Sequence, residues 1–310
     1  MQKILEVKGL SKKFGDHLVL DNLNFDIEEG SIVGVIGRSG CGKTTLLNTL
    51  VGFLKADAGK LFYKGKEISK SNSGLRNNIG FAVQESSLYN KLNVVENLNY
   101  FGKLYGLSNH DIKERTEILL RTFGLTEARH VLGGNLSVGM QKRLDIACAL
   151  IHDPEILLLD EPTANLDHML RKNIVELIKQ VNDSGTTVII SSHHLEDIRN
   201  ICHKVLIINN RKAVAFDTPE NLELNFSSHK LIKLESELKN YAQLVSTLTN
   251  TGLVRKHYMQ ENKLMLFTKD IKSTLKLINQ HYSQSNDNLI NIDIIKPSLD
   301  TIFEHISRKP

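Results

Sequence analysis

The chain has 310 residues, of which 41% are hydrophobic and 24% are charged, and its formal net charge is +4. This composition is typical of a globular protein, is long enough for more than one domain, and excludes the collagen-like and disordered classes. Because the net charge is small and no long Lys/Arg block occurs, nucleic acid is not an expected partner.

The sequence contains no apolar run near the roughly 18 residues of a membrane-spanning helix. The first residues also lack the apolar core and cleavage site of a signal peptide, so a cytoplasmic location is expected. The three cysteines, Cys41, Cys148 and Cys202, have neither a metal-ligand spacing nor the even count of a disulfide framework. They are predicted to be reduced thiols.

A predicted strand at residues 31–36 leads into the glycine-rich segment 37–44, and a helix is expected to begin near Lys43. In such a setting, glycines let backbone N–H groups converge on phosphate oxygens, and the helix presents its positive end to them. The spacing predicts a P-loop in which Lys43 contacts the β and γ phosphates, Thr44 contacts Mg²⁺ and Thr45 contacts the α-phosphate. The residues assigned to the nucleotide here are Gly37, Ser39, Gly40, Cys41, Gly42, Lys43, Thr44 and Thr45.

Cys41 lies within this loop, close to the predicted start of the helix. A helix N-terminus favours the thiolate over the thiol. The expectation is therefore that Cys41 is alkylated readily and that bound MgATP protects it.

Further along the chain, a strand at residues 79–83 precedes Gln84, and apolar residues at helical spacing follow. They predict a helical subdomain over about residues 86–150. Its last helix begins at Ser137, which is well placed to cap it, and Gly139 lies in the first turn. A helix N-terminus of this kind can bind an anion.

Two more apolar strands end in polar residues. The strand at residues 156–159 ends in Asp160 and Glu161, and the strand at residues 187–190 leads to His193. Ligands bind at the carboxyl ends of parallel strands, so the two carboxylates are candidates for the same site as the P-loop.

In this order, the P-loop, Gln84, residues 136–140, the two carboxylates and residues 162–167 resemble the ABC ATPase family over about the first 220 residues. The resemblance implies an α/β P-loop NTPase fold with a helical subdomain. It also implies ATP as substrate, Mg²⁺ as cofactor and ATP hydrolysis as the activity.

The resemblance also assigns roles to individual residues. Asp160 would hold Mg²⁺ together with Thr44 and Gln84, and Glu161 would act as the general base toward the attacking water. His193, rather than the histidine that follows it, would contact the γ-phosphate.

Other residues take part in the family through the adenine or through a second subunit. Phe14 matches the aromatic residue that stacks on adenine. Ser137 and Gly139 match the signature segment that faces the γ-phosphate of the partner, and Asp167 matches the residue that crosses the dimer interface. A second copy or a homologous ATPase subunit is therefore an implied partner.

The signature Leu-Ser-Val-Gly-Met departs from the family pattern Leu-Ser-Gly-Gly-Gln at Val138 and Met140. Methionine at this position, together with residues 84–107, resembles the drug-resistance-type ABC exporters. Their helical subdomain contacts an integral-membrane permease subunit, which would place this chain at the inner face of the membrane.

The alternative is an ABC ATPase that acts on ribosomes or DNA. Such proteins carry tandem cassettes or long coiled coils, and this chain has one P-loop and no extended heptad repeat.

The nucleotide motifs end near residue 220, so residues 1–222 and 223–310 are predicted as separate domains. The second follows a βαββαβ pattern, with Leu238, Tyr241 and Leu244 on one helix face and alternating isoleucines at residues 290–294. A small ferredoxin-like α+β domain is expected. A final helix capped by Ser298 resembles the tail of drug-export ATPases. Because no catalytic constellation occurs here, dimer support or regulation is the expected role.

Overall fold

A computed structural model describes residues 2–68, 77–193, 195–227, 230–268 and 270–295. The chain divides into two compact units, with the boundary between Pro219 and Glu220. This boundary lies at the start of helix α7 (Pro219–Ser227), whereas the sequence placed it between residues 222 and 223.

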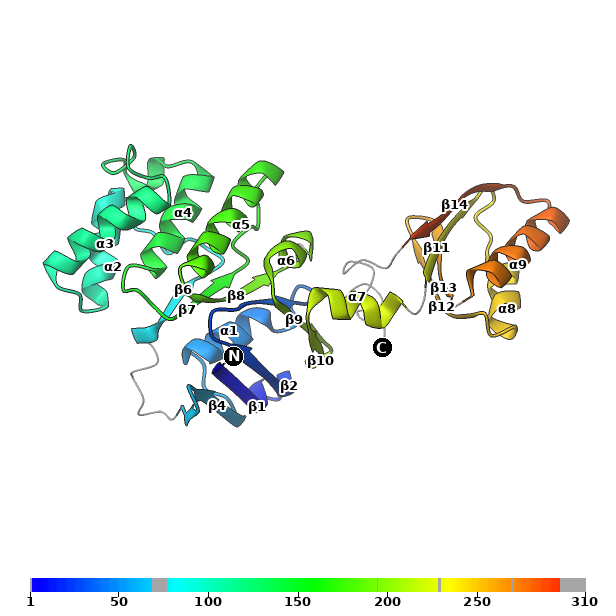
Figure 1. The fold of residues 1–310 in the computed structure, drawn as a ribbon, viewed down its shortest axis with the longest axis horizontal. Coiled ribbons are helices and arrows are strands. Elements are labelled where there is room, and N and C mark those ends of the chain that lie inside the picture. The colour runs from blue at the N-terminus through cyan, green and yellow to red at the C-terminus, as the bar shows by residue number, and fades with distance from the viewer. Residues whose placement is uncertain (1, 69–76, 194, 228–229, 269, 296–310) are drawn as a thin grey trace. The chain divides into compact units, whose positions relative to one another are not determined.

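The first unit is built on a six-stranded sheet in the order β10-β9-β3-β8-β7-β6 (Figure 1). Its strands are β3 (Ile32–Ile36), β6 (Ile79–Ala82), β7 (Ile156–Asp160), β8 (Thr187–Ser192), β9 (Lys204–Asn209) and β10 (Lys212–Asp217). All neighbours run parallel except β10, which is antiparallel to β9. Every residue of β3, β7 and β8 is buried, as expected for parallel strands covered on both faces. Their carboxyl ends therefore share one edge.

A second, antiparallel sheet of the first unit has the order β2-β1-β4-β5. It consists of β1 (Lys3–Phe14), β2 (His17–Glu28), β4 (Ala58–Tyr63) and β5 (Lys66–Glu67). One apolar core joins this sheet to the parallel sheet and to helix α1 (Lys43–Val51), through residues such as Leu23, Leu46 and Leu158. Helix α1 is thereby held between the two sheets.

Helices α2 (Val94–Leu104), α3 (Asn109–Thr122) and α4 (Val138–Ala149) form a helical group within the first unit (Figure 1), with a short 3₁₀ turn at Gly133–Asn135 before α4. Asn93 and Glu96 form a reciprocal capping box at the start of α2. The hydroxyl of Ser137 accepts a hydrogen bond from the Met140 amide and caps α4, as predicted. Helices α5 (His168–Asp183) and α6 (Leu195–Ile201) complete the described helices of this unit before α7.

After α7, the second unit has the predicted βαββαβ order. Its elements are β11 (Lys230–Ser236), α8 (Ala242–Asn250), β12 (Val254–Gln260), β13 (Lys263–Thr268), α9 (Ile271–Gln284) and β14 (Leu289–Ile295). The antiparallel sheet order β12-β13-β11-β14 is that of a ferredoxin-like fold. Residues from the sheet and both helices, among them Leu234, Leu244 and Ile278, form a separate apolar core.

Leu238 lies differently from the prediction, and two isoleucines of the correctly predicted strand β14 are exposed. Leu238 precedes α8 and is 64% exposed, because the helix begins only after its N-cap residue Tyr241. Ile290 and Ile294 are 60% and 51% exposed on the edge strand β14, so the alternating isoleucines do not form a buried face. The helix predicted from Ser298 lies outside the described residues.

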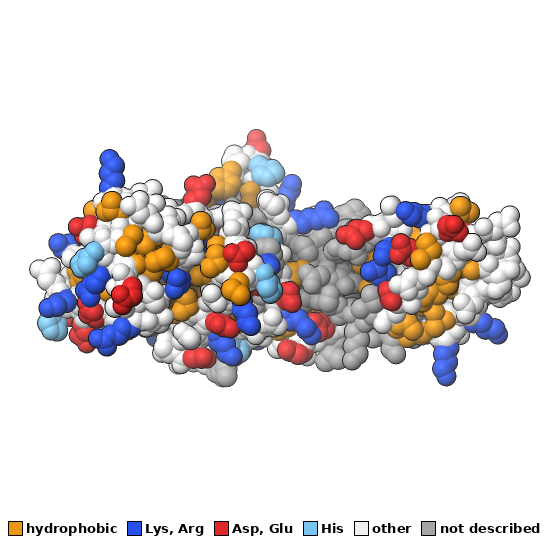
Figure 2. Space-filling view, turned by 90° about the horizontal axis from the view of Figure 1, so that it is seen from above, with side chains coloured by type: hydrophobic (Ala, Val, Ile, Leu, Met, Phe, Trp, Pro, Cys, Tyr) orange, Lys and Arg blue, Asp and Glu red, His pale blue; other side chains and the backbone are white. Residues whose placement is uncertain are grey.

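Within the described part of the chain, no helix combines the length and apolarity needed to cross a membrane. On the face seen in Figure 2, acidic and basic side chains are interspersed. The charge of that face is therefore mixed rather than of one sign.

The separate cores predict that the two units unfold independently. Leu244 is completely buried in the second core, so Leu244→Ala should destabilise the second unit by about 2–5 kcal/mol. If the predicted P-loop of the first unit binds MgATP, this ligand should still raise the unfolding temperature of the first unit, because ligands stabilise only the unit that binds them. Differential scanning calorimetry with and without MgATP measures both effects. Leu158→Ala, in β7, is the control that should destabilise the first unit instead. Loss of the MgATP shift in Leu244→Ala would contradict the independence of the units.

Candidate active site

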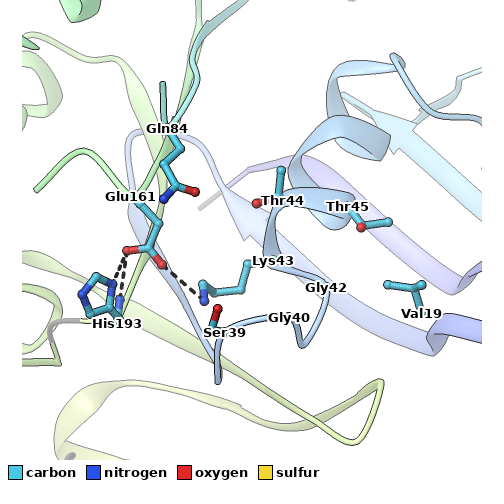
Figure 3. A pocket seen from close by; sticks show the side chains of 10 residues that line it. All are labelled: Val19, Ser39, Gly40, Gly42, Lys43, Thr44, Thr45, Gln84, Glu161 and His193. Carbon is cyan, nitrogen blue, oxygen red and sulfur yellow. Dashed lines mark hydrogen bonds and ion pairs between the residues drawn. The ribbon is translucent and has the colours of Figure 1, made fainter. Parts of the chain in front are cut away.

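A cavity of about 650 Å³ lies where the parallel strands end (Figure 3). The residues that line it are Val19, Ser39, Gly40, Gly42, Lys43, Thr44, Thr45, Gln84, Glu161 and His193. All except Val19 are predicted site residues. They follow four different strands, since the P-loop follows β3, Gln84 follows β6, Glu161 follows β7 and His193 follows β8.

The loop between β3 and α1 requires glycine at two positions. Gly42 is the N-cap of α1 and has a φ of 107°, and a Cβ there would lie 2.8 Å from Leu20 Cδ2. A Cβ at Gly37 would lie 2.3 Å from the Cys41 Sγ and 2.8 Å from a backbone oxygen. The loop can therefore pack closely and present the N-terminus of α1 to the cavity, which is the geometry of an anion site.

Three charged or ionisable side chains meet at the base of this cavity (Figure 3). The Lys43 Nζ donates a hydrogen bond of 2.9 Å to the Gly37 carbonyl and lies 3.3 Å from Glu161 Oε1. The other carboxylate oxygen of Glu161 lies 2.6 Å from His193 Nδ1. The side chains of Lys43 and Glu161 are each only 8% exposed. Because a buried charge is costly without a partner, each of these two groups requires the other in this arrangement.

The backbone of Glu161 is in the left-handed region, with a φ of 49°, which is uncommon for a residue other than glycine. Its amide donates to the Ser191 hydroxyl at 2.9 Å, and this hydroxyl in turn donates to Asp160 Oδ1 at 2.5 Å. Ser191 therefore positions both acidic residues. Strained backbone held by such contacts is frequent at functional sites.

Sequence reasoning missed Ser191 and Val19. The signal for Ser191 is its register, because Asp160 and Ser191 are directly paired between β7 and β8. That pairing is known only when the two strands are known to be neighbours. No local pattern distinguishes Val19 from other strand residues.

The predicted magnesium ligands Thr44, Gln84 and Asp160 offer hydroxyl, amide and carboxylate oxygens. Thr44 and Gln84 line the cavity, and Asp160 is buried at the adjoining end of β7. Mg²⁺ prefers oxygen ligands, so this set of donors fits the ion.

Seven predicted residues do not line the cavity; three of them, Gly37, Cys41 and Asp160, lie next to residues that do, and the other four lie elsewhere. Ser137 and Asp167 act as N-caps, of α4 and α5 respectively, and Gly139 lies beside Leu170 on α5. Phe14 lies at the end of β1 and is 49% exposed. All four, Phe14, Ser137, Gly139 and Asp167, were assigned to the nucleotide site, and none of them borders the cavity within this chain.

The expectation of a reactive Cys41 thiolate is wrong. Cys41 is half-buried in the loop, and this burial raises the pKa of its thiol. The positive charge of Lys43 opposes the effect and offsets only part of it. Loss of hydration therefore outweighs the favourable electrostatics on which the expectation was based.

Comparisons with known proteins agree with this geometry. A family model described as ABC transporter matches residues 20–164. The chain is 33% identical over 243 residues to the linearmycin resistance ATP-binding protein LnrL of Bacillus subtilis (strain 168), covering 78% of each chain. It is 33% identical over 264 residues to the methionine import ATP-binding protein MetN of Clostridium tetani (strain Massachusetts / E88), covering 84% of this chain and 80% of MetN. Among solved structures, cbiO1 of Clostridium perfringens, part of the ABC transporter complex cbiONQ, has a TM-score of 0.67 and 28% identity, covering 72% of this chain and 91% of cbiO1.

The raised pKa of Cys41 predicts slow alkylation. At pH 7 the thiolate fraction should be smaller than that of free cysteine, and it should increase as the pH rises toward the elevated pKa. Iodoacetamide should therefore modify Cys41 more slowly than free cysteine, as measured by mass spectrometry across a pH series. The buried Cys148 and Cys202 serve as internal controls, since their modification would report unfolding. Alkylation faster than that of free cysteine at pH 7 would contradict the prediction.

Proposed function

This chain belongs to the ATP-binding proteins of the ABC transporters, and on that premise we propose that it drives an export-type transporter whose permease is a separate membrane subunit. Family membership confirms the predicted ATP-hydrolysing activity and the predicted role in transport. Subunits of this kind work with membrane permeases. The proposal therefore places the chain at the cytoplasmic face of the membrane, attached through its permease.

One observation carries the proposal for the site: Lys43, Gln84, Glu161 and His193 follow four separate strands and border one cavity. Residues so far apart in the sequence meet there because their strands are parallel. The cavity combines an anion-binding helix N-terminus with a carboxylate and an imidazole, which are the groups that phosphoryl transfer to water requires.

Lys43 and Glu161 have complementary roles in this proposal. The ammonium group of Lys43 provides positive charge for the β and γ phosphates. These phosphates compete for it with the Glu161 carboxylate. Glu161 then accepts a proton from the attacking water as general base. His193, 2.6 Å from the Glu161 carboxylate, holds that carboxylate in place and contacts the γ-phosphate.

For the metal we propose Thr44, Gln84 and Asp160 as the residues that hold Mg²⁺, directly or through water. The ion would neutralise charge on the phosphate oxygens. Ser191 keeps Asp160 oriented through the hydrogen bond between their side chains.

We also propose that two copies associate head to tail and complete each other's sites. Ser137 and Gly139 do not border the cavity of their own chain, although α4 presents a capped N-terminus suited to an anion. Val138, between them, is 60% exposed. A second copy that placed its triphosphate at this exposed helix end would give the signature its ligand, and Asp167 would lie at the interface.

Export is proposed because residues 84–107 resemble those of drug-resistance exporters and because LnrL is named as a resistance protein. MetN, named as an import protein, is equally identical, so the direction needs its own test. In cells with the chain and its permease, loss of ATPase activity should raise the intracellular amount of a fluorescent dye that the transporter carries. A fall in dye content would indicate import.

The role of Glu161 predicts the behaviour of Glu161→Gln. The amide keeps the shape of the carboxylate and loses the base, so turnover should fall by about 10²-fold or more. MgATP should bind at least as tightly as before, because the competitor for Lys43 loses its charge. Steady-state ATP hydrolysis and equilibrium nucleotide binding measure the two effects. Glu155→Gln, just before the opposite end of β7, is the control and should hydrolyse ATP normally. Hydrolysis by Glu161→Gln near the wild-type rate would exclude Glu161 as the base.

The head-to-tail dimer predicts complementation between two damaged chains. Lys43→Ala removes the phosphate-binding charge, and Val138→Asp places a carboxylate where the partner's γ-phosphate would lie. Aspartate in the first turn of α4 also favours the helix, so the second variant should fold. Gly139 is less suitable, because a side chain there would lie 2.9 Å from Leu170.

Each variant alone should be nearly inactive, whereas an equal mixture should recover ATPase activity. Random pairing makes half of the dimers mixed, and each mixed dimer has one undamaged site, so about a quarter of the sites should work. Ile118→Asp, a similar substitution of an exposed residue on α3, is the control and should stay active alone. A mixture that forms mixed dimers and remains inactive would count against sites shared between two chains.

A further inference from the structure

Gln84 lies on a short segment, residues 83–87, that connects β6 to the helical group. We call it the Gln84 segment. Val83 is half-buried, whereas Gln84 and the three residues after it are exposed. Figure 3 shows the Gln84 side chain pointing into the cavity between Glu161 and Thr44. Because apolar burial does not hold these exposed residues, other contacts must determine where Gln84 lies.

Two charged side chains of α4 contact both ends of the Gln84 segment. Lys142 Nζ donates a hydrogen bond of 3.2 Å to the carbonyl oxygen of Val83. Asp145 Oδ1 accepts two hydrogen bonds from Ser87, at 3.1 Å from its amide and 2.6 Å from its hydroxyl. One turn of α4 therefore holds the residue before Gln84 and the residue three positions after it.

Asp145 is buried and Lys142 is partly buried, although both carry ionisable groups. Their side chains are 11% and 0% exposed, and Lys142 Nζ lies 3.7 Å from Asp145 Oδ2. Within the described residues, Asp145 Oδ2 has no hydrogen-bond partner. Burial raises the pKa of Asp145. Burial also lowers the pKa of Lys142, and the negative charges of Asp145 and Asp160 offset part of this decrease. A pair of apolar residues would avoid this desolvation cost, so packing alone does not account for the pair.

Helix α4 also begins with the signature residues. Ser137 caps it and Gly139 lies in its first turn, one turn or two before Lys142 and Asp145. A rigid helix thus carries both the signature and the two side chains that hold the Gln84 segment. Any displacement of α4 must move the two together or break the polar contacts.

We propose that Lys142 and Asp145 are positioning residues that couple the place of Gln84 in the cavity to the position of α4. This inference rests on the proposed role of Gln84 in the site. Lys142 and Asp145 act through the Gln84 segment and not on the nucleotide itself. Loss of their contacts should therefore lower kcat more than it weakens nucleotide binding.

Ser87→Ala is the first test, because Ser87 is exposed and its loss should not unfold the chain. It removes the 2.6 Å hydrogen bond to Asp145. We expect kcat for ATP hydrolysis to fall about tenfold, the lower end of the loss typical when a residue that supports a metal ligand is removed. The dissociation constant for MgATP should change by less than about twofold, since the P-loop is untouched. Ser87→Thr, which keeps the hydroxyl, should restore kcat.

A double-mutant cycle with Gln84→Ala separates positioning from general stabilisation. If Ser87 acts through Gln84, the double variant Gln84→Ala/Ser87→Ala should be no slower than Gln84→Ala alone. The matched control is Glu28→Gln, which breaks the Lys204–Glu28 ion pair of 2.7 Å elsewhere in the first unit. Glu28→Gln should keep its kcat in both backgrounds.

A second variant removes both charges together, Lys142→Met/Asp145→Leu, and so leaves no buried charge unpaired. Hydrogen exchange of the full chain should be faster across residues 83–88 in this variant, because the Ser87 amide loses its acceptor. The unfolding temperature should stay near that of Glu28→Gln.

The outcomes are distinct. The coupling would be overturned by an unchanged kcat in Ser87→Ala or by unchanged hydrogen exchange across residues 83–88. It would also be overturned if adding Ser87→Ala to Gln84→Ala lowered kcat by the same factor as Ser87→Ala does alone. If Gln84→Ala itself keeps full activity, the proposed role of Gln84 fails and the coupling fails with it. If Gln84→Ala is slow and Ser87→Ala is not, the coupling fails and the proposed role of Gln84 stands.

Discussion

The buried ion pair between Lys43 and Glu161 is the interaction on which the arrangement of the cavity depends. Lys43 follows β3 and Glu161 follows β7, and these strands are not neighbours, since β8 lies between them. The pair can form only because all three strands end at one edge, and His193 after β8 contacts the same carboxylate. A phosphate group that enters the cavity would replace Glu161 as the partner of Lys43. It would leave the carboxylate with His193 at the place where water can be deprotonated.

The sequence was sufficient for the elements of the site whose physical signal is local. A buried strand and the glycines before Lys43 predicted the P-loop, and a second buried strand ending in carboxylates placed Asp160 and Glu161 with it, whereas Gln84 and His193 were assigned through the family resemblance. It was insufficient where the outcome depends on neighbours in space. Ser191 is recognised only through the pairing of β7 with β8. The backbone conformation of Glu161 depends on the hydrogen bond that its amide donates to the Ser191 hydroxyl. Cys41 was mispredicted because its pKa is a balance of burial and charge, and sequence reveals only the charge.

The second unit shows the same limit in another form. Its βαββαβ order follows from periodicity, because buried residues recur every second position in strands and every third or fourth in helices. Periodicity does not show whether a neighbouring helix or strand covers a given side chain. Ile290 and Ile294 alternate like core residues but lie on the edge strand β14, where their side chains remain half exposed or more. Leu238 has helical spacing from residues of α8 and yet precedes the helix, since Tyr241 forms its cap.

In the proposed coupling, helix α4 would transmit a change at the surface of the first unit to the cavity. An apolar contact between α4 and the Gln84 segment would tolerate sliding, because dispersion forces depend weakly on direction. The hydrogen bonds of Lys142 to Val83 and of Asp145 to Ser87 are directional and lie at opposite ends of the segment. A rotation of α4 that keeps the hydrogen bond at one end of the segment would therefore break the hydrogen bond at the other end. Breaking either contact would leave a charged side chain unpaired in a largely buried place, and this penalty makes the link stiff. Such local violations of the preference for apolar cores are expected where function, rather than stability, selects the residue.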